Sequence, residues 1–302
     1  MILCIGEILA DMIGEEKNGI TTYERKAGGA PFNVACAAKK FGADVKFVGN
    51  VGDDLIGEFL IKFAKDFGMD TTYISKDANR NTTLAFVELN EEGDRSFCFY
   101  RKNTADYFMP PVSDELIKSA DIVCIGSLMM ADENCVSYAL DIIERAHALN
   151  KIVAFDVNYR TDIYKDTASA VKTYKKILAK ADIVKFSEDE VETFTESYIT
   201  EELFDKLVLI TLGKHGSEWR YKGKRSSMPT IDVKPIDTTG AGDAFFAGAL
   251  SVLDKKADKM FNPDVLDFAI KFGNVTGALN TTGRGAIDNL PTLDEISKHI
   301  NN

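Results

Sequence analysis

Short apolar segments alternate along the chain with longer segments of helical periodicity. Several apolar segments are rich in Val and Ile and lack an apolar–polar alternation, which is typical of strands covered on both faces. We expect buried strands at Ile2–Ile5, Val45–Val48, Ile122–Ile125, Ile152–Phe155, Ile183–Phe186 and Leu207–Leu212. We expect helices at Pro31–Phe41, Leu55–Phe67, Asn134–Leu149 and Ala168–Ala179. The alternation predicts an α/β fold with a doubly wound, mostly parallel sheet flanked by helices.

Some segments depart from this alternation. Thr82–Leu89 and Arg95–Arg101 are extended and are joined by residues 90–94, so they predict a β-hairpin. Gly19–Lys26 is also extended. Because these strands do not fit a parallel layer, we place them in a small β lid over its edge, although a surface hairpin can also be mere decoration. The prediction is a single α/β domain, 1–302, with lid strands inserted from about 13–27 and 80–105.

Composition narrows the function classes. The 302 residues carry a formal net charge of −11 without a dense basic run. Nucleic-acid binding rests on Lys and Arg that neutralise phosphates, so no nucleic-acid partner is expected. We find no signal peptide and no apolar run of the roughly 20 residues that a membrane helix needs, and we expect a cytoplasmic protein. The cysteines form no CxxC pair and are interpreted as reduced thiols, mostly buried: Cys4, Cys36, Cys98, Cys124 and Cys135.

Ligands of open α/β sheets bind outside the carboxyl ends of the strands. Polar or glycine residues that follow the expected strands are therefore candidates for the site. They are Asp11, Asn158, Arg160, Glu190, Gly213 and Asp237.

The stretch DTTGAGDAFFAGAL, Asp237–Leu250, contains glycines ahead of an apolar run. It lacks the lysine of a P-loop and the third glycine of a dinucleotide fingerprint, which disfavours a nucleotide-binding oxidoreductase. The run Ala244–Leu253 is apolar almost all round and predicts a buried helix. Backbone N–H groups of Gly240, Ala241 and Gly242, together with the helix dipole, suit phosphate oxygens.

Asp243 at this anion site has two interpretations. It can cap the helix, which is worth about 0.5–2 kcal/mol. Alternatively it is a general base that accepts the proton of a hydroxyl group while the backbone N–H groups stabilise an incoming phosphoryl group.

Other residues favour the second interpretation. The run Lys26–Asn33 places a double glycine before a helix with an amide in its first turn, and with Asp11 it offers hydrogen bonds for a polyol. GGAPFNVACAAKKFGADVKFVGNVGDDLIGEFL resembles the first signature of the PfkB (ribokinase-like) sugar kinases, and DTTGAGDAFFAGAL resembles their second. The resemblance extends over essentially all of the chain. Within the family the chain is most similar to fructokinases, through GEILADMI, LAFVELNEEGDRSFCFYR, NTADYFM, FDVNYR and KFSEDEVE.

The resemblance implies transfer of phosphate from ATP to a sugar primary hydroxyl, with Asp243 as the base and Gly240–Asp243 as the anion hole. It implies Mg²⁺ and an activating K⁺ as cofactors. It implies sugar contacts from Asp11, Gly28, Gly29, Asn33 and Asn158, with Phe97, Phe99 and Arg101 entering from the lid. It also implies an active-site arginine, Arg160, and nucleotide contacts from Thr211, Leu212, Gly213, Gly216 and Asn274. Asp237, Thr239, Arg284 and Gly285 match the monovalent-cation loops, and Glu190 matches the acidic residue that organises Mg²⁺ through water.

The sequence departs from the family pattern near two of these residues. Val157 and Tyr159 replace the more frequent proline and leucine beside Asn158 and Arg160. Ser187 stands in place of the asparagine of the NxxE motif, and we assign it no metal role. The histidines His147, His215 and His299 match no motif, so neither a zinc site nor a histidine base is expected.

The resulting hypothesis is a fructokinase that converts ATP and D-fructose to ADP and fructose 6-phosphate. A 2-keto-3-deoxygluconate kinase or a ribokinase of the same fold stays open, since Arg101 or Arg25 could bind a sugar acid. A catalytically inactive sugar-binding regulator is a rival of another class, but its expected mark, a lost base or anion hole, is absent from the sequence.

The lid hairpin has one further ambiguity. Phe97, Phe99 and Arg101 alternate along one predicted strand and so share a face. That face can close over the sugar or contact a second subunit in a homodimer. A cation on an otherwise apolar face needs a partner, which favours contact with the sugar.

Overall fold

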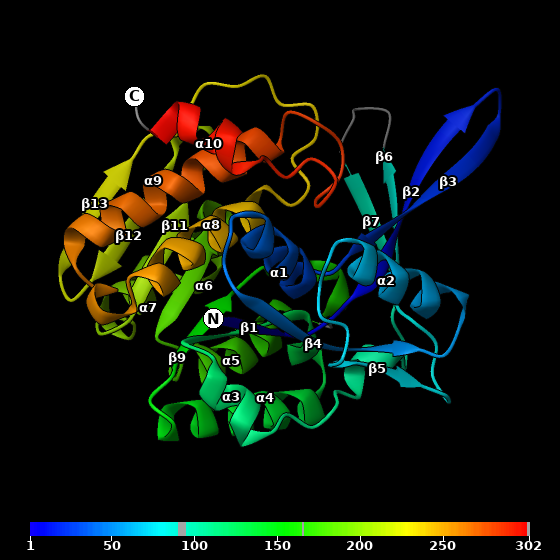
Figure 1. Ribbon diagram of the computed structural model, residues 1–302, viewed down its shortest axis with the longest axis horizontal. Coiled ribbons are helices and arrows are strands. Elements are labelled where there is room, and N and C mark those ends of the chain that lie inside the picture. The colour runs from blue at the N-terminus through cyan, green and yellow to red at the C-terminus, as the bar shows by residue number, and fades with distance from the viewer. Residues whose placement is uncertain (90–94, 165, 301–302) are drawn as a thin grey trace.

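The computed structural model describes residues 1–89, 95–164 and 166–300. Across these residues, nine strands form one sheet in the order β13-β12-β11-β10-β9-β8-β1-β4-β5 (Figure 1). The strands from β5 to β11 are parallel, and β12 and β13 form an antiparallel edge. The strands are β1 (Ile2–Ile5), β4 (Val45–Gly52), β5 (Ile74–Asp77), β8 (Ile122–Ile125), β9 (Ile152–Asp156), β10 (Ile183–Ser187), β11 (Leu207–Thr211), β12 (Ser217–Tyr221) and β13 (Lys224–Met228). The predicted doubly wound, mostly parallel sheet is confirmed.

Helices cover both faces of this sheet. The side chains of β1 show why the strands of this sheet are continuously apolar. Ile2 and Cys4 belong to the core on one face of the sheet, and Leu3 and Ile5 belong to the core on the other face. The first core is closed by α1, α2, α8, α9 and α10, and the second by α3 to α7. The helices are α1 (Ala30–Lys40), α2 (Leu55–Asp66), α3 (Asp114–Ser119), α4 (Glu133–Ala148), α5 (Thr167–Leu178), α6 (Glu188–Phe194), α7 (Glu196–Glu201), α8 (Ala241–Lys255), α9 (Pro263–Asn280) and α10 (Leu293–Ile300).

The differences from the predicted elements lie at the edges of the sheet. All six expected buried strands are present, but β5, β12 and β13 were not expected. β12 and β13 read SEWRY and KRSSM, which lack a continuous apolar run; β13 is the edge strand and exposes polar side chains to water, and β12 lies between it and β11. β4 runs on to Gly52 because its last residues pair with β5.

The lid is a separate sheet of four strands in the order β3-β2-β6-β7. Its strands are β2 (Leu9–Lys17), β3 (Ile20–Gly28), β6 (Leu84–Leu89) and β7 (Arg95–Tyr100). The predicted hairpin is present as the antiparallel pair β6–β7, and its connection lies outside the described residues. In Figure 1 the β2–β3 ribbon extends away from the main sheet.

Two boundaries of the predicted lid are wrong. The lid begins at Leu9 rather than near residue 13, so Asp11 lies inside β2 and does not follow a strand of the main sheet. β7 ends at Tyr100, so Arg101 lies just beyond the strand. The β2 error arises because GEILADMI continues the apolar pattern of β1 without a turn signal that separates the two strands.

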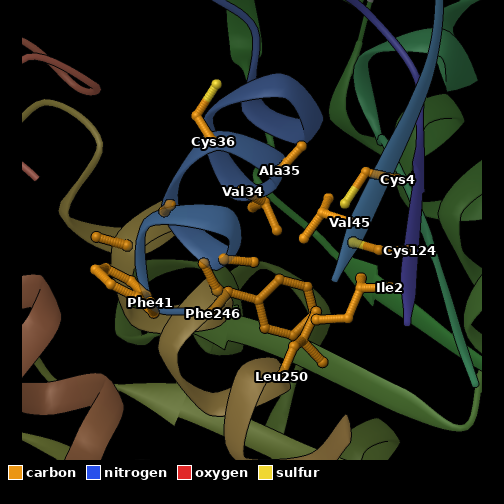
Figure 2. Close-up of a cluster of buried hydrophobic side chains, with 14 of the residues drawn as sticks. Ile2, Cys4, Val34, Ala35, Cys36, Phe41, Val45, Cys124, Phe246 and Leu250 are labelled. Carbon is orange, nitrogen blue, oxygen red and sulfur yellow. The ribbon is translucent and has the colours of Figure 1, made fainter. Parts of the chain in front are cut away.

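Helix α8 is the centre of the first core, as its all-round apolar sequence predicts. Figure 2 shows Phe246 and Leu250 of α8 beside Val34 of α1 and Ile2 of β1. α8 also packs closely on α9, because a Cβ atom on Gly273 would lie 2.8 Å from the carbonyl oxygen of Phe245. α8 therefore has a fixed position, which its first turn inherits. Among the helices of the described residues, none combines the length and apolar character that crossing a bilayer requires.

Replacement of Phe246 by alanine tests the importance of this core. Phe246 is fully buried, so Phe246→Ala should lower the free energy of unfolding by about 3–5 kcal/mol. Phe268→Ala on α9 is the matched control, since Phe268 is 44% exposed and its loss should cost less than about 1 kcal/mol. Denaturant unfolding of both variants measures the difference. Equal losses would show that α8 is not the centre of the core.

Candidate active site

The N-terminus of α8 forms a concave backbone surface. Gly240 is the N-cap with a φ of 75°, a left-handed conformation that favours glycine. A Cβ atom there would lie 2.5 Å from the Cβ of Ala286, so the close approach also requires glycine. The helix begins at Ala241, three residues before the predicted start, because Ala241, Gly242 and Asp243 all adopt helical geometry in the first turn. The Ala241 N–H donates to the Thr238 carbonyl at 3.2 Å, and the N–H groups of Gly242 and Asp243, which have no partner within the helix, suit an anion.

Asp243 lies in this first turn but does not occupy the N-cap position. Its Oδ2 atom accepts a hydrogen bond of 2.8 Å from Nδ2 of Asn33 on α1. Burial raises the pKa of the Asp243 carboxyl group, whereas the Asn33 hydrogen bond and the charges of Lys185 and Arg160 oppose that rise. The capping interpretation is therefore wrong for Asp243, and the carboxylate faces α1 beside the anion-binding turn.

Residues from β2, β3 and α1 gather on the Asn33 side of Asp243. A Cβ atom on Gly28 would lie 2.1 Å from Oδ2 of Asp11, so only glycine leaves room for this carboxylate. Gly29 has a φ of 107° and is the N-cap of α1. The Oδ1 atom of Asn33 is buried without a hydrogen-bond partner. A buried acceptor of this kind is well placed for a ligand hydroxyl group.

A cavity of about 500 Å³ opens on the other side of the α8 N-terminus. Four of the predicted nucleotide residues line it, namely Thr211, Gly213, Gly216 and Asn274, together with Ala241 and Gly242. Leu212 is not among its lining residues. The loop 230–235 forms a further wall that the sequence did not reveal, because its residues carry no motif. The volume lies in the range that small-molecule and cofactor sites occupy.

Two of the lining residues shape the cavity through the backbone. A Cβ atom on Gly216 would lie 2.0 Å from the carbonyl oxygen of Met228, so glycine lets the loop pass against β13. Nδ2 of Asn274 donates to the carbonyl oxygens of Met228 and Pro229, at 2.9 and 3.3 Å. Asn274 thus holds the start of the wall loop in position.

Glu190 connects the ends of β9 and β10. Its Oε1 atom accepts from the Tyr159 N–H at 2.6 Å, and its Oε2 atom accepts from the Ser187 N–H at 2.7 Å. Ser187 in turn caps α6 through the Glu190 N–H. Asn158 is half-buried with a φ of 36°, and Arg160 is exposed and lowers the pKa of Asp243. Val157 and Tyr159 stand where the family pattern has proline and leucine, and with them Arg160 is still within electrostatic reach of Asp243.

The predicted cation loops are tied together by one carboxylate. Asp237 accepts from the Thr239 N–H at 2.7 Å and from the Gly285 N–H at 2.9 Å. Asn280 donates to the Thr239 carbonyl at 3.2 Å, and its own Oδ1 atom is buried without a partner. Arg284 is exposed. An orphaned buried oxygen beside main-chain carbonyls fits a hard monovalent cation, and no cluster of acidic, His or Cys ligands for a metal occurs in the described part of the chain.

The lid residue Arg101 has partners within the protein that the sequence did not reveal, although its Nη2 atom is buried without a hydrogen-bond partner. The Arg101 side chain is 3% exposed, and its Nε donates to Oδ2 of Asp106 at 2.6 Å. Its Nη1 donates to the Leu128 carbonyl at 2.7 Å. The argument that its charge favours contact with the sugar therefore loses its basis, because the charge is paired with Asp106 beneath the lid, and a sugar contact from Arg101 stays a prediction. Phe99 is half-buried and packs on a cluster of Leu9, Ala85 and Leu128, and the side chain of Phe97 lies outside the described residues.

Sequence reasoning missed the buried ionisable groups near the site. Glu7 is fully buried, and burial raises its pKa to about 8. Lys185 forms a buried ion pair with Asp156, with Nζ 2.9 Å from Oδ1. The signal was present in IVKFS, since a lysine inside a strand covered on both faces is rare unless it is paired.

Comparisons with known proteins agree with this geometry. The model of the "pfkB family carbohydrate kinase" matches residues 1–293. The chain belongs to the pfkB family of carbohydrate kinases. It is thus a phosphotransferase with an alcohol acceptor, and the predicted family, fold and enzyme class are confirmed.

The relatives of this pfkB-family kinase include fructokinases. It is 36% identical to a fructokinase of Vibrio alginolyticus, over 98% of this chain and 97% of that protein. It is 34% identical to "Probable fructokinase-5" of Arabidopsis thaliana, over 99% and 96%. The structure of Xylella fastidiosa fructokinase with bound ATP has a TM-score of 0.90 and 30% identity, over 99% and 98%. Vibrio cholerae O395 fructokinase with fructose, ADP and calcium has a TM-score of 0.88 and 31% identity, over 99% and 98%.

The Arg101 pair is testable through stability. Arg101→Ala should lower the free energy of unfolding by about 3–5 kcal/mol, because it leaves the Asp106 carboxylate buried and unpaired. Lys62→Ala removes the exposed Lys62–Asp66 pair and should change it by less than about 1 kcal/mol. Denaturant unfolding provides the measurement. A stable Arg101→Ala variant whose only defect is a raised KM for sugar would restore Arg101 to the sugar site.

Proposed function

We propose that this pfkB-family kinase transfers the γ-phosphoryl group of ATP to the 6-hydroxyl of D-fructose. The observation that carries the proposal is the position of Asp243 in the first turn of α8, whose neighbours Ala241 and Gly242 line a cavity and whose carboxylate bonds to Asn33. The groups proposed for the sugar are Asn33 and the Asp11–Gly28 contact, and the space proposed for ATP is the cavity of about 500 Å³. The fructokinases with bound ATP, or with fructose and ADP, support the choice of both substrates.

The reaction follows from the groups at the α8 N-terminus. The Asp243 carboxylate accepts the proton of the sugar hydroxyl as its oxygen bonds to the γ-phosphorus. The bond from that phosphorus to the bridging oxygen breaks, and the electron pair leaves with ADP. Backbone N–H groups of Gly240–Asp243 donate to the phosphoryl oxygens, where the helix dipole favours the added negative charge.

Other residues of the proposal bind and orient the substrates. Asp11, Gly28, Gly29, Asn33 and Asn158 are proposed for the sugar, with Phe97 and Phe99 of the lid excluding water, a competing acceptor. Thr211, Gly213, Gly216 and Asn274 hold the nucleotide, with Leu212 beside them, and Arg160 approaches the phosphates. Mg²⁺ would be held near Glu190 through water and would neutralise charge on the β- and γ-phosphates. The Glu190 oxygens keep lone pairs for such waters after accepting the two main-chain N–H groups.

A panel of acceptors tests the proposal directly. ADP release should be fastest with fructose among fructose, ribose, mannose, 2-keto-3-deoxygluconate and nucleosides, each at one subsaturating concentration. Phosphorus NMR of the product should show a phosphomonoester at C6. A preference for 2-keto-3-deoxygluconate or ribose would assign the enzyme to another sugar, and ATP binding without phosphorylation of any acceptor would indicate an inactive regulator.

Substitution of the proposed base gives the sharpest kinetic test. Asp243→Asn should reduce kcat by roughly 10²–10⁴-fold, because the amide cannot accept the hydroxyl proton, while ADP binding stays unchanged. Asp264→Asn is the control, since Asp264 lies in the first turn of α9 and is exposed. Burial raises the pKa of Asp243 above the ordinary carboxyl value of about 4. The activity of the native enzyme should therefore fall as the pH drops through this raised pKa, because the protonated carboxyl group cannot accept the hydroxyl proton. Near-native turnover of Asp243→Asn would exclude the base role.

A cation at the Asp237 loops should activate the enzyme. These loops adjoin the anion hole, since Gly240 packs against Ala286, so a K⁺ ion there would fix the main-chain groups of the turn. Turnover should be several-fold higher in potassium than in tetramethylammonium at equal ionic strength. Asp237→Asn should reduce this ratio. Equal rates in both salts would remove the cation from the mechanism.

A further inference from the structure

A buried ammonium group lies beside the anion-binding turn and has no role in the mechanism above. Lys185 is on β10, between Val184 and Phe186, and is 5% exposed. Its Nζ atom is 2.9 and 3.0 Å from the two carboxylate oxygens of Asp156 on β9. Burial of a charged pair carries a large desolvation cost, which makes such a pair weak support for a purely stabilising role.

Gly242 shows where this ammonium points. A Cβ atom built on Gly242 would lie 3.1 Å from Nζ of Lys185. Every Cα–Cβ bond of an α-helix tilts towards the N-terminus of the helix. Since Gly242 is in the first turn of α8, that Cβ position lies on the side of the turn where an anion binds. The ammonium therefore lies against the first turn of α8, and the absence of a side chain at Gly242 keeps the space between them open.

The number of donors leaves the ammonium available to a ligand. Lysine carries three N–H donors, and the Asp156 carboxylate accounts for at most two of them. The bidentate contact fixes the position of Nζ and leaves a donor for another acceptor. The Lys185 charge also acts on Asp243, whose pKa it lowers. The same cation is thus within electrostatic reach of the proposed base.

We propose that Lys185 is a further catalytic residue that donates its remaining hydrogen to the γ-phosphoryl group at the mouth of α8. Asp156 is the positioning residue that holds the ammonium there. The role rests on the proposed function in one respect, that ATP is the phosphoryl donor. During transfer the sugar proton goes to Asp243 and the electron pair of the broken P–O bond leaves on ADP, while Lys185 keeps its proton and stabilises charge on the phosphoryl oxygens.

Nucleotide binding without sugar separates this role from a structural one. The variants are Asp156→Asn, which keeps the ammonium, and Asp156→Asn/Lys185→Met, which removes it without leaving a buried carboxylate unpaired. Calorimetry with Mg²⁺ gives Kd for ADP and for a non-hydrolysable ATP analogue. We expect ADP to bind all forms within about twofold, and the analogue to bind the double variant about tenfold more weakly. Asp156→Asn alone should weaken the analogue by less than about threefold, because the donor is still present.

Turnover provides the second measurement. With the sugar that the native enzyme prefers, kcat of the double variant should fall about 10²-fold below that of Asp156→Asn, as for loss of one preorganised donor. Equal weakening of ADP and the analogue, or equal kcat in the two variants, would overturn the proposal and leave an ion pair that only stabilises the fold.

The two proposals fail separately. If the native enzyme phosphorylates another sugar, the assignment of fructose is wrong, but the comparison of ADP with the ATP analogue still tests Lys185. If the native enzyme prefers fructose but binds the analogue no more tightly than ADP, Lys185 has no contact with the γ-phosphate. The assignment of fructose then still stands.

Discussion

The hydrogen bond between Asn33 and Asp243 joins the starts of two helices that lie far apart in the sequence. It links the first turn of α1 to the first turn of α8 over 2.8 Å. Both helices belong to the same apolar core, and α8 is fixed by its packing on α9. The relative position of the groups that we propose for the sugar and for the phosphate therefore depends on helix packing rather than on flexible loops, and preorganised donors need no rearrangement when charge develops.

Charge balance is the second constraint on this site. Acidic groups surround Asp243 within electrostatic reach, including Asp156 and Glu7, and burial raises the pKa of both. Because the pKa of Glu7 is raised to about 8, this group is mainly protonated at neutral pH. It therefore adds little negative charge near the proposed phosphate site. Lys185 and Arg160 supply the positive charge that keeps Asp243 available as an anion. A buried general base needs this arrangement, because burial alone would favour its protonated form.

The sequence predicted the parts of the fold and site that depend on local signals. Continuous apolar runs predicted six strands of the main sheet, because both faces of those strands are buried; they are β1, β4, β8, β9, β10 and β11. Glycines predicted the turn at α8, since Gly240 needs both a left-handed φ and close contact with Ala286. The polar strands β12 and β13 carried no such signal, and neither did the boundary between β1 and β2.

What the sequence could not give is the pairing of groups across the fold. The sequence shows an arginine at position 101 whether its side chain binds the sugar or an acidic residue. Only the tertiary structure shows that its partner is Asp106, five residues later in the chain. Lys185 and Asp156 are 29 residues apart and become neighbours because β9 and β10 are parallel with Lys185 opposite Asp156. That register places an ammonium at the carboxyl end of the sheet, below the turn of α8. The helix packing that fixes Asp243 and the strand register that fixes Lys185 thus converge on the first turn of α8, where Gly242 leaves the space beside the ammonium open and where we propose that the phosphoryl group binds.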